Sequence, residues 1–98
     1  MTIDQVRNNS ELLLIISGRI DTSTAPGFEK AINDNIENIT SLILDFRDVS
    51  YISSAGLRVL LSAQKVMNIQ GRMKLLHVND TVMQIFEVTG FSYLLTIE

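Results

Sequence analysis

Hydrophobic and polar positions along this chain predict a series of short strands. The apolar run from Leu12 to Ser17 is near-continuous, which indicates a strand buried on both faces. Ile3 to Arg7 predicts a short strand before it, and Asn8-Asn9-Ser10 predicts a turn, so the two strands are expected to pair antiparallel. Further strands are expected at Leu42 to Phe46, extended by Tyr51-Ile52, at Met73 to Val78 and at Tyr93 to Ile97.

Apolar residues at helical spacing predict three helices between these strands. Ser23-Thr24, Ser53-Ser54 and Asn79-Asp80 are suited to cap the amino termini, and Pro26 fits the first turn of the first helix. Gly71 is predicted to end the second helix in a left-handed conformation, and Gly90 to end the third. The apolar positions are Phe28, Ala31, Ile32, Ile36 and Ile39 in the first helix, Leu57, Leu60, Leu61, Gln64 and Met67 in the second, and Val82, Ile85 and Phe86 in the third.

The order of these elements predicts an α/β fold with a mixed, mostly parallel five-stranded sheet. After the first two strands, helices and strands alternate, so the three or so helices are expected to form right-handed crossovers. In such sheets binding surfaces gather at the carboxyl ends of the strands. The loops at those ends run from Gly18 to Thr24 and from Val49 to Gly56, and function is expected there.

Composition and charge narrow the class of protein. The 98 residues are 46% hydrophobic and 19% charged with one proline, which predicts a single folded domain over residues 1–98. The net charge of −3 offers no basic surface for nucleic acid or an anionic membrane. The absence of cysteine fits a cytoplasmic location best. The longest apolar run, Leu12 to Ile16, is far shorter than the ~20 residues that cross a bilayer, and residues 1–5 lack the features of a signal peptide, so no membrane insertion is expected.

The loop before the second predicted helix carries the most informative chemistry. Two hydroxyls, on Ser53 and Ser54, stand where the helix begins, and a helix amino terminus favours a phosphate group through its free N–H groups and partial positive charge. Arg58, four residues beyond Ser54, lies about one helical turn away and can reach such a phosphate. Gly56 adds no side chain, so we expect a partner to approach the backbone there. The alternative is that Ser53 or Ser54 only caps the helix, as serine commonly does.

The remaining polar residues give weaker signals. Asp21 and Thr22 lie in the other loop, where Asp21 can contact a partner, form an Asx turn, or do both. His77 is the single histidine, and with no second histidine and no cysteine it does not form a usual metal site. Neither a Gly-x-Ser-x-Gly nucleophile elbow nor a phosphate-binding glycine loop is present. We therefore expect no cofactor, no metal and no enzymatic activity.

Three motifs resemble those of the bacterial STAS-domain anti-sigma factor antagonists. Val49 to Leu61 (VSYISSAGLRVLL) resembles the family's signature around its phosphorylated serine. Gly18 to Pro26 (GRIDTSTAP) is similar to the family's Gly-x-Ile/Leu-Asp loop before the first helix. Phe86 to Phe91 (FEVTGF) matches the pattern Phe-x-x-Thr-Gly-Leu/Phe near the carboxyl terminus. The motifs occur in the family's order, and the resemblance as a whole covers essentially the entire chain without large insertions.

The resemblance implies a mechanism called partner switching. In the family, the unphosphorylated antagonist binds an anti-sigma factor that is also a serine kinase, which frees the sigma factor. The kinase phosphorylates the serine after an aspartate at the start of the second helix, and a protein serine phosphatase resets the switch. The acceptor position here is Ser54, while Ser53 replaces the aspartate and is the alternative acceptor. The sigma factor is then only an indirect partner.

The resemblance also implies a fold and a contact surface. The fold is a single STAS domain whose first strand is antiparallel, with the spatial strand order 1-3-2-4-5. The candidate partner-binding residues are Asp21, Thr22, Ser53, Ser54, Gly56, Leu57 and Arg58. One alternative is a STAS module that is never phosphorylated and acts as a subunit of a sensory or lipid-transport assembly. A small hydrolase that uses Ser54 is a second alternative, disfavoured because no general base is identifiable.

Overall fold

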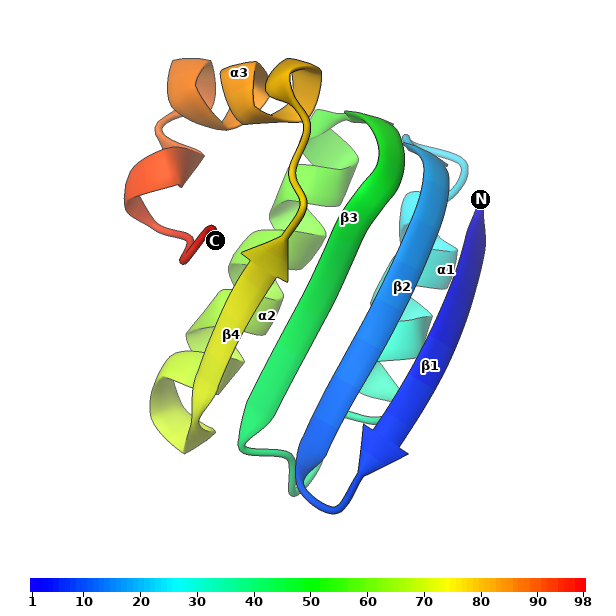
Figure 1. Cartoon of the computed structure of the whole chain (residues 1–98), viewed down its shortest axis with the longest axis vertical. Helices are drawn as coiled ribbons and strands as arrows, with labels where there is room; N and C mark the ends of the chain where they lie inside the picture. Colours follow the sequence, from blue (N-terminus) through cyan, green and yellow to red (C-terminus); the bar gives the residue numbers. More distant parts are fainter.

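The computed structural model describes all residues from Met1 to Glu98 as one sheet with helices packed against it (Figure 1). The predicted hairpin and the three predicted helices are confirmed, as is the extension of the third strand through Tyr51 and Ile52. In chain order the elements are β1 (Thr2–Asn8), β2 (Glu11–Ile20), α1 (Ala25–Asn33), β3 (Ser41–Ile52), α2 (Ser54–Gln70), β4 (Arg72–Leu76), α3 (Asp80–Thr89) and the 3-10 turn η1 (Phe91–Tyr93).

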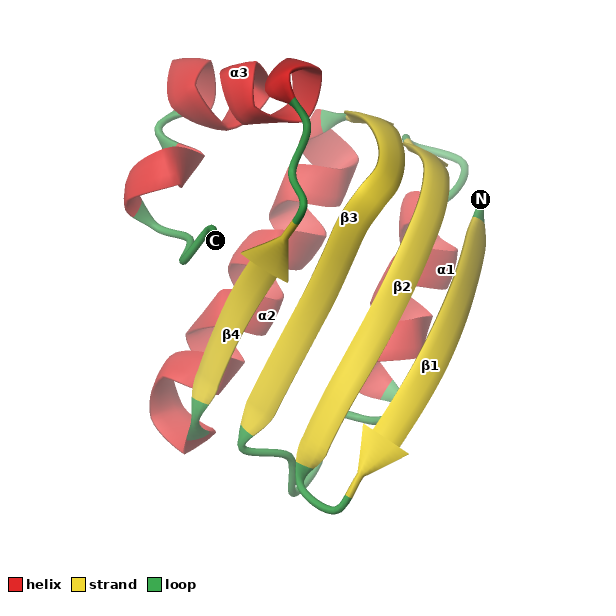
Figure 2. Ribbon diagram, viewed as in Figure 1, coloured by secondary structure: helices red, strands yellow, loops and turns green.

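The strand order of the sheet differs from the expected one. The strands lie in the order β1-β2-β3-β4, with β1 antiparallel to β2 and the other neighbours parallel, so the expected order 1-3-2-4-5 is wrong. The steps from β2 to β3 and from β3 to β4 run in the same direction across the sheet. Right-handed crossovers that step in one direction place their helices on the same face, and Figure 2 shows α1 and α2 together behind the sheet.

One face of the sheet is therefore buried and the other is uncovered. In β2, Leu12, Leu14 and Ile16 are fully buried, whereas Leu13 and Ile15 between them are partly exposed. This corrects the prediction that the run from Leu12 to Ser17 is covered on both faces. An apolar run alone does not distinguish a strand with two covered faces from one whose second face is apolar and open.

The fifth predicted strand is absent. Residues Phe91–Tyr93 form the turn η1, and the segment after it makes only an isolated parallel bridge between Leu75 and Ile97. Two hydrogen bonds hold that bridge, from the Leu75 N–H to the Thr96 carbonyl and from the Glu98 N–H to the Leu75 carbonyl, at 2.9 Å each. Gly90 ends α3, as predicted, and it does so in the left-handed conformation. The turn η1 includes Tyr93, the first residue of the predicted strand, and Leu94 is its C-cap residue.

Two helix ends also differ from the sequence pattern. α1 ends at Asn33, so Ile36 and Ile39 lie in a loop that is tied down by the Gln70 side chain, whose Nε2 donates to both carbonyls at 2.7 Å. Gly71 follows α2 with a φ of 175°, which is extended rather than left-handed. A Cβ at position 71 would lie 1.9 Å from the Thr40 carbonyl oxygen, so glycine is required by close backbone contact and not by backbone conformation.

Candidate functional site

The two predicted loops meet at the carboxyl ends of β2 and β3. The Ser53 N–H donates to the Ile20 carbonyl at 2.8 Å, which joins the exit of one strand to the start of α2. The parallel register continues to this point, with Ile20 opposite Ile52. The structure therefore brings Asp21 and Thr22 from one loop beside Ser53 and Ser54 from the other, as the sequence predicts for the ends of parallel strands.

The adjacent serines at the start of α2 have different structural roles. Ser53 is the N-cap residue, with extended backbone, and its Oγ accepts from the Gly56 N–H at 3.5 Å, a long capping bond. Ser53 is half-buried, while Ser54 is exposed and its hydroxyl makes no hydrogen bond within the chain. By helix geometry the N–H groups of the first turn have no intrahelical partner. Ser54 thus presents a free hydroxyl beside a partial positive charge.

Gly56 and Leu57 do not form part of the exposed surface. Gly56 is buried, and a Cβ there would lie 2.7 Å from side-chain carbons of both Ile20 and Ile52. Leu57 is buried in the same core. The expectation that a partner approaches the backbone at Gly56 is therefore wrong: the close approach is made by the protein's own strand ends. Because Gly56 has no side chain, the first turn of α2 packs directly against Ile20 and Ile52 at the strand ends, and this packing determines the position of Ser54.

The Asp21 loop is organised around one carboxylate oxygen. Asp21 Oδ1 accepts from the Ser23 N–H at 3.0 Å, the Ser23 hydroxyl at 2.8 Å and the Thr24 N–H at 3.1 Å. Thr24, which the sequence suggested as a capping side chain, makes no such cap and instead donates its hydroxyl to the Arg19 carbonyl at 2.8 Å. The Asx turn is confirmed, and the exposed Thr22 lies at its tip.

We expect this loop to loosen in acid. The Ser23 hydroxyl, followed by the Thr24 N–H, donates to the ionised carboxylate and lowers the pKa of Asp21 below its usual value. The ionised form therefore stabilises the loop above the ordinary pKa, and that contribution is lost as the pH falls through the lowered value. In an NMR titration the amide shifts of Ser23 and Thr24 should follow the protonation of Asp21. In Asp21→Ala their amide exchange should be several-fold faster at neutral pH. Unchanged exchange in that variant would contradict this account.

Arg58 lies on the exposed side of α2, one turn beyond Ser54. It forms no ion pair within the chain, so its guanidinium is free to meet an anion. A shallow cleft of about 360 Å³ runs between the first turns of α1 and α2, with Thr22, Ala55 and Arg58 among the residues that line it. A phosphate on Ser54 would thus stand at a helix amino terminus, one residue before Ala55 of a cleft that contains the unpaired cation of Arg58 and also the carboxylate of Glu29.

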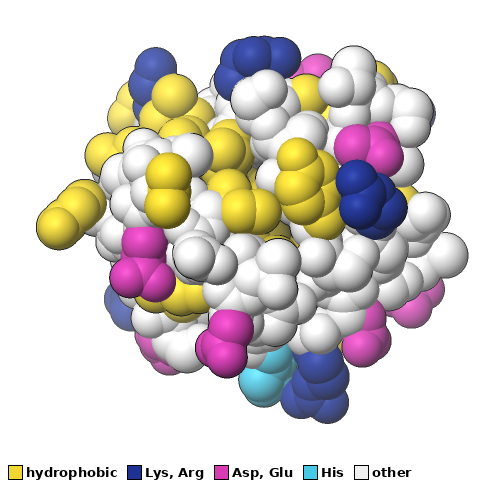
Figure 3. Space-filling view, turned by 90° about the horizontal axis from the view of Figure 1, so that it is seen from above, with side chains coloured by type: hydrophobic (Ala, Val, Ile, Leu, Met, Phe, Trp, Pro, Cys, Tyr) yellow, Lys and Arg dark blue, Asp and Glu magenta, His cyan; other side chains and the backbone are white.

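The sequence prediction missed an apolar surface beside this site. The guanidinium of Arg19 lies over the Tyr51 ring, 4.5 Å from its centroid. Tyr51 also lines a hollow of about 320 Å³ against α3, together with Ile85 and Val88, and Val88 is 82% exposed. Figure 3 shows hydrophobic side chains gathered across this end of the molecule. The sequence feature that could have indicated this surface is Val88, an apolar residue on the polar side of the third predicted helix.

His77, which directly follows β4, belongs to a separate polar cluster with Asp45 and Arg47 of β3. Its Nδ1 lies 3.0 Å from Asp45 Oδ1, and its Nε2 lies 3.2 Å from a guanidinium nitrogen of Arg47. Because a guanidinium only donates, Nε2 accepts and Nδ1–H donates to Asp45. Partial burial raises the pKa of Asp45, but the Arg47 N–H and His77 outweigh it, and the net shift is downward. The cluster contains no serine, threonine or cysteine, and nowhere in the chain do three or more His, Cys, Asp or Glu side chains form a group that could hold a metal ion.

The fold agrees with what comparison to known proteins shows. The chain belongs to the STAS domain family, whose model matches residues 2–98. It is 28% identical over 98 residues to the anti-sigma-B factor antagonist of Bacillus subtilis, a match that covers 99% of this chain and 90% of that protein. It is 30% identical over 94 residues to the anti-sigma-B factor antagonist of Listeria monocytogenes, covering 94% and 82% of the two chains.

Solved structures of similar fold include an anti-sigma factor antagonist in two states. The antagonist SpoIIAA in its unphosphorylated form superposes with a TM-score of 0.84 at 19% identity, over 99% of this chain and 88% of that one. The Bacillus cell fate determinant SpoIIAA in its phosphorylated form gives a TM-score of 0.76 at 18% identity, over 99% and 91% of the chains. At these identities the likeness establishes the fold. No helix of this chain is both long enough and apolar enough to cross a membrane.

Proposed function

We propose that this protein is an anti-sigma factor antagonist controlled by phosphorylation of Ser54. The observation that carries the proposal is the difference between the two serines at the start of α2. Ser53 is used as the helix cap and is half-buried, whereas Ser54 is exposed with a free hydroxyl. A kinase can reach Ser54, and the helix amino terminus together with Arg58 favours the phosphate once it is attached.

The partner we propose is an anti-sigma factor that is itself a serine kinase. In its unphosphorylated form the protein binds this kinase, which releases the sigma factor and so regulates transcription. A protein serine phosphatase restores the binding form. The protein then acts as a cytoplasmic binding module and kinase substrate, not as an enzyme, and it meets the sigma factor only indirectly. Relatives named anti-sigma-B factor antagonists and a phosphorylated structural neighbour support this assignment.

The proposed contact surface is the end of the sheet that carries both loops. From the loops it includes Asp21, Thr22, Ser53, Ser54 and Arg58, and it continues over Tyr51 onto Val88 of α3. Gly56 and Leu57 act beneath this surface, because both are buried. An apolar groove beside a polar rim is typical of protein interfaces, where buried contacts give affinity and polar ones give specificity.

The intact mass of the protein from its own cells tests the acceptor assignment. We expect a mass increase of one phosphoryl group in a fraction of the wild type and none in Ser54→Ala. Ser53→Asp is the matched control, since aspartate also caps a helix, and it should still be phosphorylated. Phosphate that persists in Ser54→Ala would contradict the assignment of Ser54. No phosphate in any variant, even with the cognate kinase and ATP, would favour a STAS module that binds its partner constitutively, as a subunit of a sensory or lipid-transport assembly.

A further inference from the structure

The uncovered face of the sheet has an apolar centre. The strand register places Val6, Leu13 and Ile43 side by side across β1, β2 and β3, and Ile15 lies two residues beyond Leu13. Val6 is 54% exposed, and the other three are partly exposed. No helix packs on this face (Figure 2). Four neighbouring apolar side chains on an open sheet face are the kind of surface that a protein partner covers.

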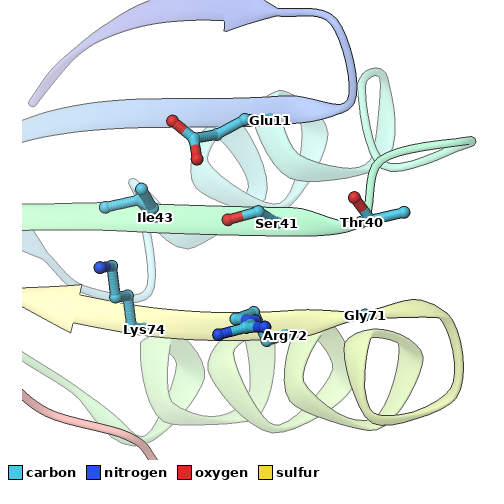
Figure 4. Close-up of a pocket in the computed structure, with 7 residues that line it drawn as sticks. All are labelled: Glu11, Thr40, Ser41, Ile43, Gly71, Arg72 and Lys74. Carbon is cyan, nitrogen blue, oxygen red and sulfur yellow. The ribbon is translucent and has the colours of Figure 1, made fainter.

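Opposite charges flank this centre at the amino ends of the parallel strands. Glu11 on β2 and Arg72 on β4 lie in one row on either side of Ser41 on β3. They border a hollow of about 540 Å³, with Ile43 and Lys74 further along it, and Figure 4 shows Glu11 on one side and the two basic residues on the other. Neither Glu11 nor Arg72 forms an ion pair within the chain, while Lys74 lies 3.7 Å from Glu98.

We propose that a second copy of this chain covers the uncovered face, in a dimer whose twofold axis runs along β3. The charge pattern favours this occupant because it is complementary to itself. A twofold axis along β3 exchanges the positions of β2 and β4 between the copies, so Glu11 of each copy faces Arg72 of the other. Sheets packed face to face lie about 10 Å apart, a gap that these long side chains span from both sides.

The same operation brings apolar groups together at the axis. Ile43 of one copy meets Ile43 of the other, and Leu13 packs on the aliphatic stem of Lys74. Aligned sheets cross at about 30°, so contact follows one diagonal rather than the whole face. Asp45, the next side chain of β3 on this face, is compensated within its own chain by His77 and the Arg47 N–H, each at 3.0 Å. Ser54 stands at the opposite end of the strands and stays free, so the dimer does not depend on the proposed switch.

Charge reversal in pairs tests this dimer sharply. Sedimentation equilibrium of the wild type should show a dimer that forms at protein concentrations between about 1 μM and 1 mM. Glu11→Arg and Arg72→Glu should each weaken it at least about tenfold by placing like charges together. The double variant Glu11→Arg/Arg72→Glu should restore it, because reversed charges remain complementary. Glu87→Arg on α3 carries the same charge change as Glu11→Arg away from this face, and it should have little effect.

Three results would overturn the proposal. The first is a wild type that stays monomeric to about 1 mM, a concentration at which even a weak dimer is populated. The second is a dimer that neither single reversal weakens, since its interface would lie elsewhere. The third is a double variant that associates no more tightly than the single variants, because the two charges would then not face each other. Circular dichroism of each variant separates loss of association from loss of folding.

Discussion

Phosphorylation of Ser54 should weaken binding of the proposed partner, an anti-sigma factor kinase, by about a thousandfold or more. A phosphate adds about −1.5 to −2 charges at neutral pH, on a side chain that is exposed in the free protein. In the proposed complex that charge is removed from water against a partner surface that accepts a neutral hydroxyl. Arg58 offsets at most one of the added charges, and burial of the remaining charge without a partner costs several kcal/mol. Since each 1.4 kcal/mol is a tenfold change in affinity, a loss of about 4 kcal/mol corresponds to a thousandfold. No refolding of the protein is required.

Calorimetric titration of the purified kinase measures this effect directly. Protein carrying phosphoserine at position 54 is compared with the unmodified chain and with Ser54→Ala, which should bind as the unmodified chain does. Phosphoserine at Ser10 is the control, because that turn is exposed at the opposite end of the sheet and carries the same added charge. Equal affinity of the unmodified and the position-54 phosphorylated proteins would exclude partner switching at this residue.

The sequence predicted the local elements well because they depend on neighbouring residues. Helix starts at Ser53-Ser54 and Asn79-Asp80 and a helix end at Gly90 follow from local backbone chemistry. All three are observed, with Ser53 and Asn79 as the capping residues. The strand order does not depend on neighbours along the chain. The apolar run at Leu12 fits a sheet covered on one face or on both, and only the direction of the crossovers decides between them.

The sequence predicted those features of the candidate site that follow from the order of the elements, and it did not predict those that depend on tertiary packing. Asp21 and Ser54 stand beside each other because parallel strands end at one edge, which the order of elements already implied. The burial of Gly56 could not be predicted, since glycine allows a close approach without indicating what approaches. Here Ile20 and Ile52 do so. The groove beside Tyr51 also required the structure, because α3 is placed there by tertiary packing.

Phe46→Ala should remove a large part of the protein's stability. Phe46 is fully buried on the helix side of β3. Its ring packs edge-on against Phe28 of α1 at a centroid distance of 6.5 Å and tilted against Phe86 of α3 at 6.4 Å. Removing a buried phenylalanine side chain typically costs about 3–5 kcal/mol, a large share of the 5–15 kcal/mol by which folded domains are stable, as a rough range.

Urea denaturation measures the loss in the free energy of unfolding. Phe46→Ala should strongly lower the urea concentration at the midpoint of unfolding. The slope of the free energy of unfolding against urea concentration should change little, which marks a change in stability and not in the cooperativity of unfolding. Tyr93→Ala is the matched control, because Tyr93 is an aromatic residue that is 92% exposed, and it should change the free energy of unfolding by less than about 0.5 kcal/mol. Similar losses in the two variants would refute the central role of Phe46. Because the Phe46 ring joins α1 and α3 to the sheet, the variant should also loosen both sides of the candidate site, the Asp21 loop before α1 and the groove on α3.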